Sequence, residues 1–474
     1  MPKAVHPRFV PPPCQDRTES GLAILRDGST ARLRLATSND TELMQAFYEK
    51  LSPESRRQRF FSASLPSADL IASLCDSGDP RTRVTLLLLR EREGSVRIVG
   101  TGSYFARNDS SAEVAFAVDD SFQGKGVGTL LLERLALVAV RHGFTSFWAV
   151  TQAENRAMRE VFRDSGFALH EQFEEGEIEI DLSVVPSEAS VARLEMRDRI
   201  ATTASLRPFF APRSVAVIGA SRDPGSIGYR ILEGLVTNRF QGPVYPVNPK
   251  ATVVACIRAY PSLRDVAGPV DLAIIAVPAK AVLSVVDDCA ARGVRALVVI
   301  SAGFAEVDKT GQELQRQLVE KVRGLGMRLV GPNCLGLLNT HPDVKLNASF
   351  SPIFPPAGRV ALLSQSGALG LAILDAARRL QLGMSTFVSV GNKADVSGND
   401  LLQYWEEDPN TDVILLYLES FGNPRRFARI ARRVGLRNPI IALKSGRSKA
   451  GERAAGSHTA AQAASDVAED AQFQ

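Results

Sequence analysis

The hydrophobic pattern of residues 30–183 alternates between the period of a strand and the period of a helix. Short apolar runs predict strands, and apolar residues repeating every three or four positions predict helices. The predicted strands are Ala31–Leu35, Val84–Leu89, Val96–Tyr104, Val114–Val118, Thr145–Val150 and Ile178–Leu182, and the predicted helices are Asp40–Lys50, Thr129–Arg141 and Asn155–Ser165. Few helices among hairpin-like strands predict an α+β domain.

From Leu206 onward the pattern becomes a regular alternation of short apolar strands and helical stretches. Such Val-, Ile- and Leu-rich strands are typical of parallel sheets that are buried on both faces. The first set of predicted strands is Val215–Ile218, Val244–Val247, Leu272–Val277, Ala296–Ile300 and Arg328–Val330. The Pro355–Gly358 stretch separates it from a second set, which is Arg359–Leu363, Met384–Val388, Val413–Leu418 and Pro439–Leu443. The sequence therefore predicts two doubly wound α/β domains in this half.

These changes of pattern divide the chain into five segments. We expect a Pro-rich, poorly ordered tail at 1–29, an α+β domain at 30–183 and a linker with a charged helix at 184–205. The two α/β domains then occupy 206–340 and 341–474. A length of 474 residues suits about three domains of ordinary size.

Composition narrows the functional classes. Hydrophobic residues make up 45% and charged residues 23%, as in ordinary soluble proteins, and a net charge of +4 gives no case for nucleic acid. The five cysteines show no CxxC pairing, which favours a reducing, cytoplasmic setting without a disulfide framework or metal site. Apolar runs stay far below the ~18 residues of a membrane span, and the N-terminus has no apolar signal region.

The first candidate binding loop is Gln123-Gly124-Lys125-Gly126-Val127-Gly128, between a predicted strand and a predicted helix. Unpaired N–H groups at a helix N-terminus bind phosphates, the glycines allow close approach, and Lys125 adds a cation. A Gly-rich loop alone is weak evidence, but its context strengthens it. Glu113 lies on the strand that enters the loop, and Asn155 opens the helix after the next strand.

This arrangement over residues 31–183 resembles the GNAT acetyltransferase family. The resemblance extends to Leu51–Arg56 and Arg59–Phe61, which are typical of GNAT domains fused to acyl-CoA-synthetase-like modules. It implies that acetyl-CoA binds at Val118, at the loop and at Asn155, and that Glu113 is the general base for an amine nucleophile. The alternative for Glu113 is a solvated carboxylate at a strand edge. No tyrosine is a convincing general acid, Tyr104 being only a guess.

The second loop runs from Gly219 to Gly228, again between a strand and a helix, and it does not fit GxGxxG. The following strand ends at Val247-Asn248-Pro249-Lys250, where an NAD enzyme would place an acidic residue for the ribose. A lysine there suits a phosphate, and Arg222 and Ser226 add donors. The loop therefore predicts a Rossmann-like domain that binds a phosphorylated nucleotide such as NADP or CoA.

Residues 206–474 resemble the α subunit of succinyl-CoA synthetase, and more closely the NDP-forming acetyl-CoA synthetase family. The matching motifs are Val217–Ser221, Val247–Lys250, Val277-Pro278, Ser301–Phe304 and Gly331–Gly336. The resemblance implies a CoA-binding Rossmann-like domain followed by a flavodoxin-like domain. The residues it assigns to CoA are Gly219, Ser221, Arg222, Ser226, Gly228, Lys250, Val277, Pro278, Pro332, Asn333 and Cys334. We expect Cys334 to pack rather than to act as a nucleophile, and a structural turn is the alternative for Pro332–Cys334.

The same resemblance assigns a phosphohistidine to His458, in the motif Ser457-His458-Thr459. It implies that Glu419 orients the histidine ring, that Ser364-Gln365-Ser366-Gly367 binds phosphate, and that Gly391–Asp395 completes the site. Two departures stand out, because Ala460 and Ala461 replace the usual glycine and no ATP-grasp portion or other NTP site follows. NDP or NTP with Mg²⁺ would therefore act only with an ATP-grasp partner or in a longer parent chain. We interpret the other four histidines as ordinary surface or turn residues.

Three functions remain open from the sequence. The leading one is an N-acetyltransferase that acts on an amine, expected to be a protein lysine, and is regulated by its CoA-binding, acyl-CoA-synthetase-like module. The second is an NDP-forming acyl-CoA ligase chain of the α type that works through phospho-His458. The third is a CoA-binding regulator without catalysis. Relatives of the ligase module tend to assemble, so a homo-oligomer is expected.

Overall fold

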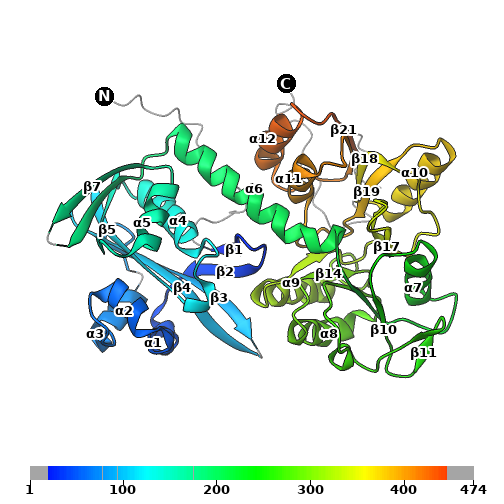
Figure 1. The fold of residues 1–474 in the computed structure, drawn as a ribbon, viewed down its shortest axis with the longest axis horizontal. Helices are drawn as coiled ribbons and strands as arrows, with labels where there is room; N and C mark the ends of the chain where they lie inside the picture. Colours follow the sequence, from blue (N-terminus) through cyan, green and yellow to red (C-terminus); the bar gives the residue numbers. More distant parts are fainter. Residues whose placement is uncertain (1–19, 77, 93, 175, 446–474) are drawn as a thin grey trace. The chain divides into compact units, whose positions relative to one another are not determined.

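The computed structural model describes residues 20–76, 78–92, 94–174 and 176–445 (Figure 1). The chain divides into two compact units, Met1–Ala201 and Thr202–Gln474, which are described separately below. His458 lies outside the described residues.

The N-terminal unit contains one eight-stranded sheet in the order β1-β2-β3-β4-β5-β6-β8-β7. The strands are β1 Gly21–Ile24, β2 Thr30–Leu35, β3 Arg83–Arg92, β4 Ser95–Ala106, β5 Ser111–Val118, β6 Ser146–Gln152, β7 Ala168–Glu174 and β8 Glu177–Ser183. Neighbouring strands are antiparallel except β5 and β6, which are parallel. The α+β fold class predicted for this region is confirmed.

Helices cover the two faces of this sheet unequally. The helices of the N-terminal unit are α1 Thr41–Lys50, α2 Pro53–Phe60, α3 Ala68–Cys75, α4 Val127–Arg141 and α5 Arg156–Asp164. Helix α6, Glu188–Phe210, begins in this unit and ends in the C-terminal unit. A large apolar core joins α4 and α5 to one face of nearly the whole sheet. A smaller core joins α1 and α3 to the other face, and there it includes residues of β3, β4 and β5 but none of β6, β7 or β8.

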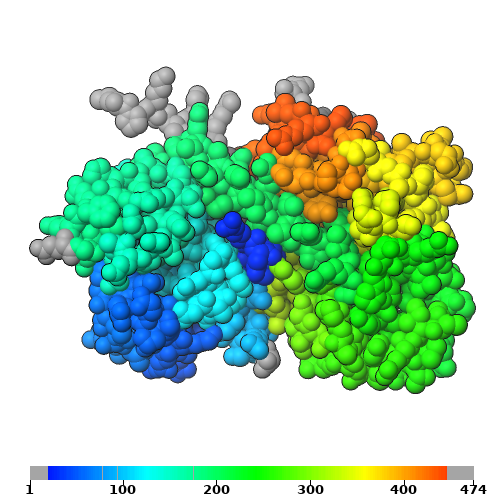
Figure 2. Space-filling model, in the orientation of Figure 1, coloured from blue at the N-terminus to red at the C-terminus, as the bar shows by residue number. Residues whose placement is uncertain are grey.

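The predicted N-terminal tail was too long. Gly21–Ile24 forms β1, which pairs antiparallel with β2, and Ala23 and Leu25 are buried in the core of the unit. The dark-blue surface segment in Figure 2 belongs to this region. A four-residue edge strand carries too few residues to show a strand period in the sequence. The predicted charged helix of the linker is the first half of α6.

The C-terminal unit begins with a five-stranded parallel sheet in the order β10-β9-β13-β14-β15. The strands are β9 Val215–Ile218, β10 Val244–Val247, β13 Leu272–Ile275, β14 Ala296–Val299 and β15 Arg328–Val330, and the helices between them are α7 Ile227–Thr237, α8 Ala279–Ala291 and α9 Lys309–Gly324. A small hairpin of β11 Val253–Val254 and β12 Ile257–Arg258 lies beside it. Strand residues point into apolar cores on both faces, as the continuous apolar runs predict.

The second sheet of this unit has six strands in the order β17-β16-β19-β18-β20-β21. The elements are β16 Gly336–Asn339, β17 Leu346–Ser349, β18 Ala357–Ser364, β19 Met384–Ser389, β20 Val413–Leu418 and β21 Ile440–Lys444, with helices α10 Gly367–Arg379, α11 Gly398–Glu407 and α12 Pro424–Val434. The sequence pattern missed β16 and β17, which pair antiparallel with each other and add an antiparallel edge beside β19. The sheet is therefore mixed rather than purely parallel.

Candidate functional site

In the N-terminal unit, the Gly-rich loop leads directly into α4. Gly124 and Gly126 have φ angles of 73° and 79°, in the left-handed region that favours glycine. Gly126 is the N-cap of α4 and offers no side chain, so no side chain caps the first N–H groups of the helix. A Cβ on Gly128 would come within 3.1 Å of Val161 on α5. These features leave the backbone of the loop open to a phosphate.

Hydrogen bonds from side chains of α2 and of the turn before the loop hold the loop in place. The Gln123 amide donates to Ser55 Oγ at 3.1 Å, and Ser55 Oγ donates to Asp120 at 2.6 Å. Burial alone would raise the pKa of Asp120, but hydrogen bonds from Ser55 and from Ser52 outweigh it and lower the pKa. The Leu51–Arg56 segment therefore acts as a support for the candidate acetyl-CoA loop.

Residues that follow β1 also contact the Gly-rich loop. The Arg26 N–H donates to the Lys125 carbonyl at 3.0 Å. The Lys125 ammonium lies 3.5 Å from the Asp27 carboxylate and 4.6 Å from the centre of the Phe122 ring. The sequence reasoning missed this support because it assigned residues 20–29 to a disordered tail.

The sheet opens next to the loop. The parallel strands β5 and β6 pair only at Ser111–Glu113, although both continue beyond these residues. A cavity of about 230 Å³ lies at this end and is lined by β5 residues up to Val118, by the loop from Gln123 to Gly128 and by Asn155. Asn155 also caps α5, since its Oδ1 accepts from Met158 N at 3.1 Å.

Glu113 and Tyr104 occupy different environments. Glu113 is exposed, lies at the last ladder pair before β5 and β6 separate, and does not line the cavity. The Tyr104 hydroxyl donates to the Pro80 carbonyl at 2.6 Å, and its ring is fully buried against Phe144. Tyr104 is thus a core residue, and the structure argues against it as a general acid.

In the C-terminal unit, the second loop is built on two backbone contacts that only glycine permits. A Cβ on Gly228 would lie 2.0 Å from the Gly219 carbonyl oxygen, and a Cβ on Gly219 would lie 2.3 Å from the Ala276 carbonyl oxygen. Ser226 caps α7, accepting from Tyr229 N at 3.3 Å, so its hydroxyl is engaged. The carboxyl ends of β9 and β13 are therefore held in close contact with the start of α7.

The predicted phosphate-binding side chains of this loop lie at the surface. Arg222 and Lys250 are exposed, and Ser221 is half-buried. The Asn248 amide donates to the Ala220 carbonyl at 2.6 Å, which ties the turn that carries Lys250 to the loop. Lysine and arginine side chains are thus available near the loop without being held by it.

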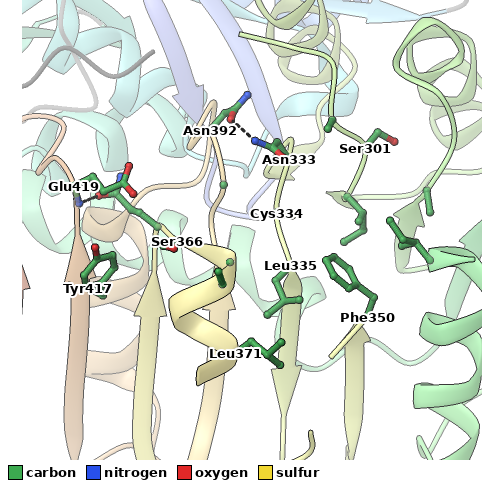
Figure 3. A pocket seen from close by; sticks show the side chains of 18 of the residues that line it. Ser301, Asn333, Cys334, Leu335, Phe350, Ser366, Leu371, Asn392, Tyr417 and Glu419 are labelled. Carbon is green, nitrogen blue, oxygen red and sulfur yellow. Dashed lines mark hydrogen bonds between the residues drawn. The ribbon is translucent and has the colours of Figure 1, made fainter. Parts of the chain in front are cut away.

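A larger cavity of about 950 Å³ lies between the two sheets of this unit (Figure 3). Figure 3 shows Glu419 and Ser366 on one side, Ser301 on the other, and the hydrogen-bonded pair Asn333 and Asn392 between them. The predicted site residues that line it are Val277, Asn333, Cys334, Gln365, Ser366, Gly367 and Glu419. The predicted residues that do not line it are Gly219, Ser221, Arg222, Ser226, Gly228, Lys250, Pro278, Pro332 and Ser364.

The phosphate-binding turn predicted at Ser364–Gly367 is tied to Glu419. Gln365 Oε1 accepts from the backbone N–H of Glu419 and from that of Ser420, the latter at 2.9 Å. Ser366 caps α10, accepting from Leu369 N at 3.3 Å. The start of α10 and the end of β20 thereby meet at one end of the cavity.

Lys393, in the predicted Gly391–Asp395 loop, was not singled out by sequence. Its ammonium donates to the Ser420 carbonyl at 2.8 Å and to Ser420 Oγ at 2.7 Å. Burial lowers the pKa of Lys393 to about 8, although the negative charge of Glu419 acts in the opposite direction. Only the folded structure brings a lysine next to Glu419, so no sequence signal identified the pair.

The same loop is anchored by a buried ion pair. Asp395 accepts from Arg328 Nε at 2.8 Å and from Leu329 N at 3.0 Å, and both charged side chains are almost completely buried. Arg328 also donates to Ser205 Oγ at 2.9 Å. Burial alone would raise the pKa of Asp395, but the charges of Arg328 and Arg323 keep it lowered. This network holds the loop that lines the cavity.

Cys334 has the properties of a packing residue. Its thiol is buried, lies 3.4 Å from the Val299 carbonyl oxygen, and has its pKa raised by burial to about 12. A thiol with such a pKa carries almost no thiolate at neutral pH. Among the described residues, no group of three or more His, Cys, Asp or Glu side chains could hold a metal ion, and no helix is long and apolar enough to cross a membrane.

Comparison with known proteins agrees with this division. Residues 42–167 match the Acetyltransferase (GNAT) family. A curated acetyltransferase of Pseudomonas aeruginosa is 30% identical over 144 residues, which are 30% of this chain and 77% of that protein. The chain belongs to the GNAT acetyltransferase family through its N-terminal unit. The GNAT domain thus carries the Gly-rich loop, the separated strands and Glu113.

Downstream of the GNAT domain, residues 213–340 match the CoA binding domain, and residues 357–474 match the Succinyl-CoA ligase like flavodoxin domain. The α subunit of acetate–CoA ligase [ADP-forming] I of Pyrococcus furiosus is 44% identical over 273 residues, or 57% of this chain and 59% of that one. The solved dinucleotide-forming acetyl-coenzyme A synthetase 1 of Ca. Korarchaeum cryptofilum, in complex with phosphate and ADP, is 46% identical, with a TM-score of 0.54. It covers 56% of this chain and 57% of that one.

The predicted order of domains is confirmed by these matches: a GNAT domain, a CoA-binding domain and a succinyl-CoA-ligase-like flavodoxin domain. The chain spans only 36% to 59% of the length of the first acetate–CoA ligases that it matches.

Proposed function

We propose that this protein is an N-acetyltransferase that transfers the acetyl group of acetyl-CoA to an amine, in the first place a protein lysine. The single observation that carries the proposal is the opening of the sheet between β5 and β6 directly beside the uncapped loop Gly124–Gly128. A pantetheine arm can enter between the separated strands while the pyrophosphate binds the N–H groups of the loop. Glu113, at the start of the separation, is the candidate general base.

The proposed reaction needs one proton transfer. A lysine amine is protonated at neutral pH and becomes nucleophilic only after losing a proton. Glu113 accepts that proton directly or through a water, the amine attacks the thioester carbonyl, and CoA leaves as a thiolate with an ordinary pKa of about 8.5. No protein acid is therefore required, in keeping with the buried and engaged hydroxyl of Tyr104.

The test is thiol release from acetyl-CoA in the presence of lysine-containing proteins. Glu113→Gln keeps the size of the side chain but removes the base, so we expect kcat to fall by about 10²- to 10⁴-fold with the KM for acetyl-CoA unchanged. Glu42→Gln, an exposed carboxylate on α1, is the matched control and should retain full activity. Unchanged kcat in Glu113→Gln would overturn the assignment of the base.

We propose that the C-terminal unit binds CoA or an acyl-CoA and regulates the transferase. The cavity of about 950 Å³ joins residues of the CoA-binding and flavodoxin-like domains, which supports a ligand of the size of CoA. A titration of the unit with CoA by calorimetry tests this, with Gly228→Ala as the variant that should not bind. Binding of CoA without turnover by any form of the chain would favour a non-catalytic regulator.

The second candidate function is the α-type half of an NDP-forming acyl-CoA ligase. One observation favours it, namely that Glu419 and Gln365 meet at one end of the cavity and that Lys393 lies within electrostatic range of Glu419, in a unit that is 44% identical to an acetate–CoA ligase α subunit. NDP, NTP and Mg²⁺ would enter only with an ATP-grasp partner. Adding such a subunit with acetyl-CoA, phosphate and ADP should produce ATP, and His458→Ala or Glu419→Gln should abolish it.

A further inference from the structure

One face of the GNAT sheet is left uncovered at β6, β8 and β7. The core beneath α1 and α3 includes no residue of these three strands. Their side chains on that face are exposed or half-buried, whereas their other face is packed against α4 and α5. In Figure 1, β7 lies at the edge of the sheet away from α1–α3. A sheet face without a covering layer is a candidate surface for a partner.

The ladder places Glu113 in one row with residues of this uncovered face. Glu113 pairs with Trp148 of β6, Trp148 pairs with Asp181 of β8, and Asp181 pairs with His170 of β7. Residues paired in this way point to the same face, and neighbouring strands lie about 4.8 Å apart. Asp181 therefore lies about 10 Å from Glu113 across the sheet.

Carboxylates continue from Asp181 along β8. Glu179 and Glu177 follow at alternate positions, so they share its face at intervals of about 7 Å. We call Glu113, Asp181, Glu179 and Glu177 the acidic row. No ion pair joins any of them to a Lys or Arg within the described part of the chain, whereas Glu171, on the opposite face of β7, pairs with Arg159 and Arg163.

The row also contains an aromatic surface that accepts a cation. The guanidinium of Arg107, an exposed residue, stacks over the Trp148 ring at 4.0 Å from its centre. Trp148 lies between Glu113 and Asp181 in the row, so a cationic side chain is already favoured at that point. A positively charged partner would be attracted to the several carboxylates gathered on this face.

We propose that the acidic row is the docking surface for a basic segment of the acceptor protein, which presents its lysine to Glu113 and turns at Asp181 to follow β8. This inference rests on the proposed acetyltransferase function. An extended chain advances about 3.3 Å per residue, so a basic residue about three positions from the acceptor lysine would reach Asp181. Where the segment then runs along β8, further basic residues at alternate positions would face Glu179 and Glu177. The acceptor is thus a lysine flanked on one side by Lys or Arg residues.

The test compares two peptides that share one acceptor lysine. One carries arginines at the third, fifth and seventh positions from the lysine, and the other carries glutamines there. The parent protein should show about a tenfold higher kcat/KM for the basic peptide at low ionic strength, and about 0.5 M salt should remove most of the preference. The variant Glu177→Gln/Glu179→Gln/Asp181→Asn should lose the preference, with kcat and the KM for acetyl-CoA unchanged.

The matched control makes the same change of charge elsewhere. Glu313→Gln/Glu320→Gln/Asp343→Asn alters three exposed carboxylates of the C-terminal unit and should keep the preference. Equal kcat/KM for both peptides in the parent would overturn the proposal, and so would an undiminished preference in the β8 variant. A change of oligomeric state in the β8 variant, without a change in peptide preference, would assign the face to a second copy of the chain and also overturn it.

Peptide binding is read separately from turnover, by fluorescence anisotropy of the labelled peptides. Binding of the basic peptide to the parent but not to the β8 variant, in a protein that acetylates no amine, would uphold the surface and reject the proposed function. Turnover of both peptides with equal binding would uphold the function and reject the surface.

Discussion

Replacing Lys393 by methionine should stabilise the C-terminal unit near neutral pH and much less at alkaline pH. Burial lowers the pKa of this lysine from its ordinary 10.5 to about 8. Because the folded-state pKa lies below the unfolded-state value, the unfolded chain binds more protons between pH 8 and pH 10.5. The free energy of unfolding of the parent therefore rises as the pH rises through this window. Methionine has a similar length and no charge, so the variant lacks this dependence.

The size of the effect follows from the pKa difference. Each pKa unit corresponds to about 1.4 kcal/mol, and between pH 7 and pH 10 the protonation difference integrates to about 2.5 kcal/mol. The advantage of Lys393→Met over the parent should shrink by this amount between the two pH values. The lost hydrogen bonds to Ser420 lower the advantage by a similar amount at both values, so they leave the difference unchanged.

The assay is urea unfolding followed by tryptophan fluorescence. The chain has two tryptophans, so a Trp148→Phe background leaves Trp405, which is fully buried in the C-terminal unit, as the reporter. Lys280→Met, at an exposed position on α8, is the control and should show no difference between pH 7 and pH 10. An equal effect of Lys393→Met at both pH values would refute the reasoning, because the lysine would then titrate alike in the folded and unfolded chain.

Three further predictions concern the same unit. Gly228→Ala should abolish the CoA-binding event of the C-terminal unit in calorimetry and leave that of the GNAT loop, because its Cβ would lie 2.0 Å from a carbonyl oxygen. Gly225→Ala would meet only a side chain at 3.3 Å and should keep both binding events. Iodoacetamide should label the exposed Cys256 long before the buried Cys334, which peptide mass spectrometry can measure. Equal labelling rates for the two cysteines would contradict the raised pKa of Cys334. Arg328→Met should lower the free energy of unfolding by about 3 kcal/mol, since it removes the buried one of the two arginine partners of Asp395 and leaves only Arg323; a loss below about 1 kcal/mol in urea unfolding would argue against that.

The parallel strands of the C-terminal unit could be predicted closely because their signal is local. Strands buried on both faces must be apolar at nearly every position, so Val215–Ile218 and Val413–Leu418 show their bounds in the sequence itself. The antiparallel edge formed by β16 and β17 gives no such signal. Its strands are four residues long, and β17 is the polar-containing Leu-Asn-Ala-Ser.

The parts of the candidate sites that need a particular backbone conformation could be predicted from the sequence. The parts that depend on contacts between residues distant in the sequence could be predicted less well. Gly124 and Gly228 could be recognised because phosphate loops need residues without a Cβ. Ser226 and Ser366 were predicted as ligand donors, yet both cap helices, a role that the same residue type serves equally well. Lys393 acquires its unusual environment from residues about 27 positions away, so its pKa could only be inferred from the fold.

The hydrogen bond between Arg26 and Lys125 has a consequence for how the acetyl-CoA loop forms during folding. The two residues lie far apart in sequence, and β1 reaches the sheet only through its pairing with β2. Contacts between distant segments form late, because the chain must first lose the entropy of the intervening loop. The loop should therefore gain its final shape only when the edge strand has docked. Affinity for acetyl-CoA then serves as a reporter of complete folding, and a protein shortened to begin at residue 30 should fold into a sheet that binds the cofactor weakly.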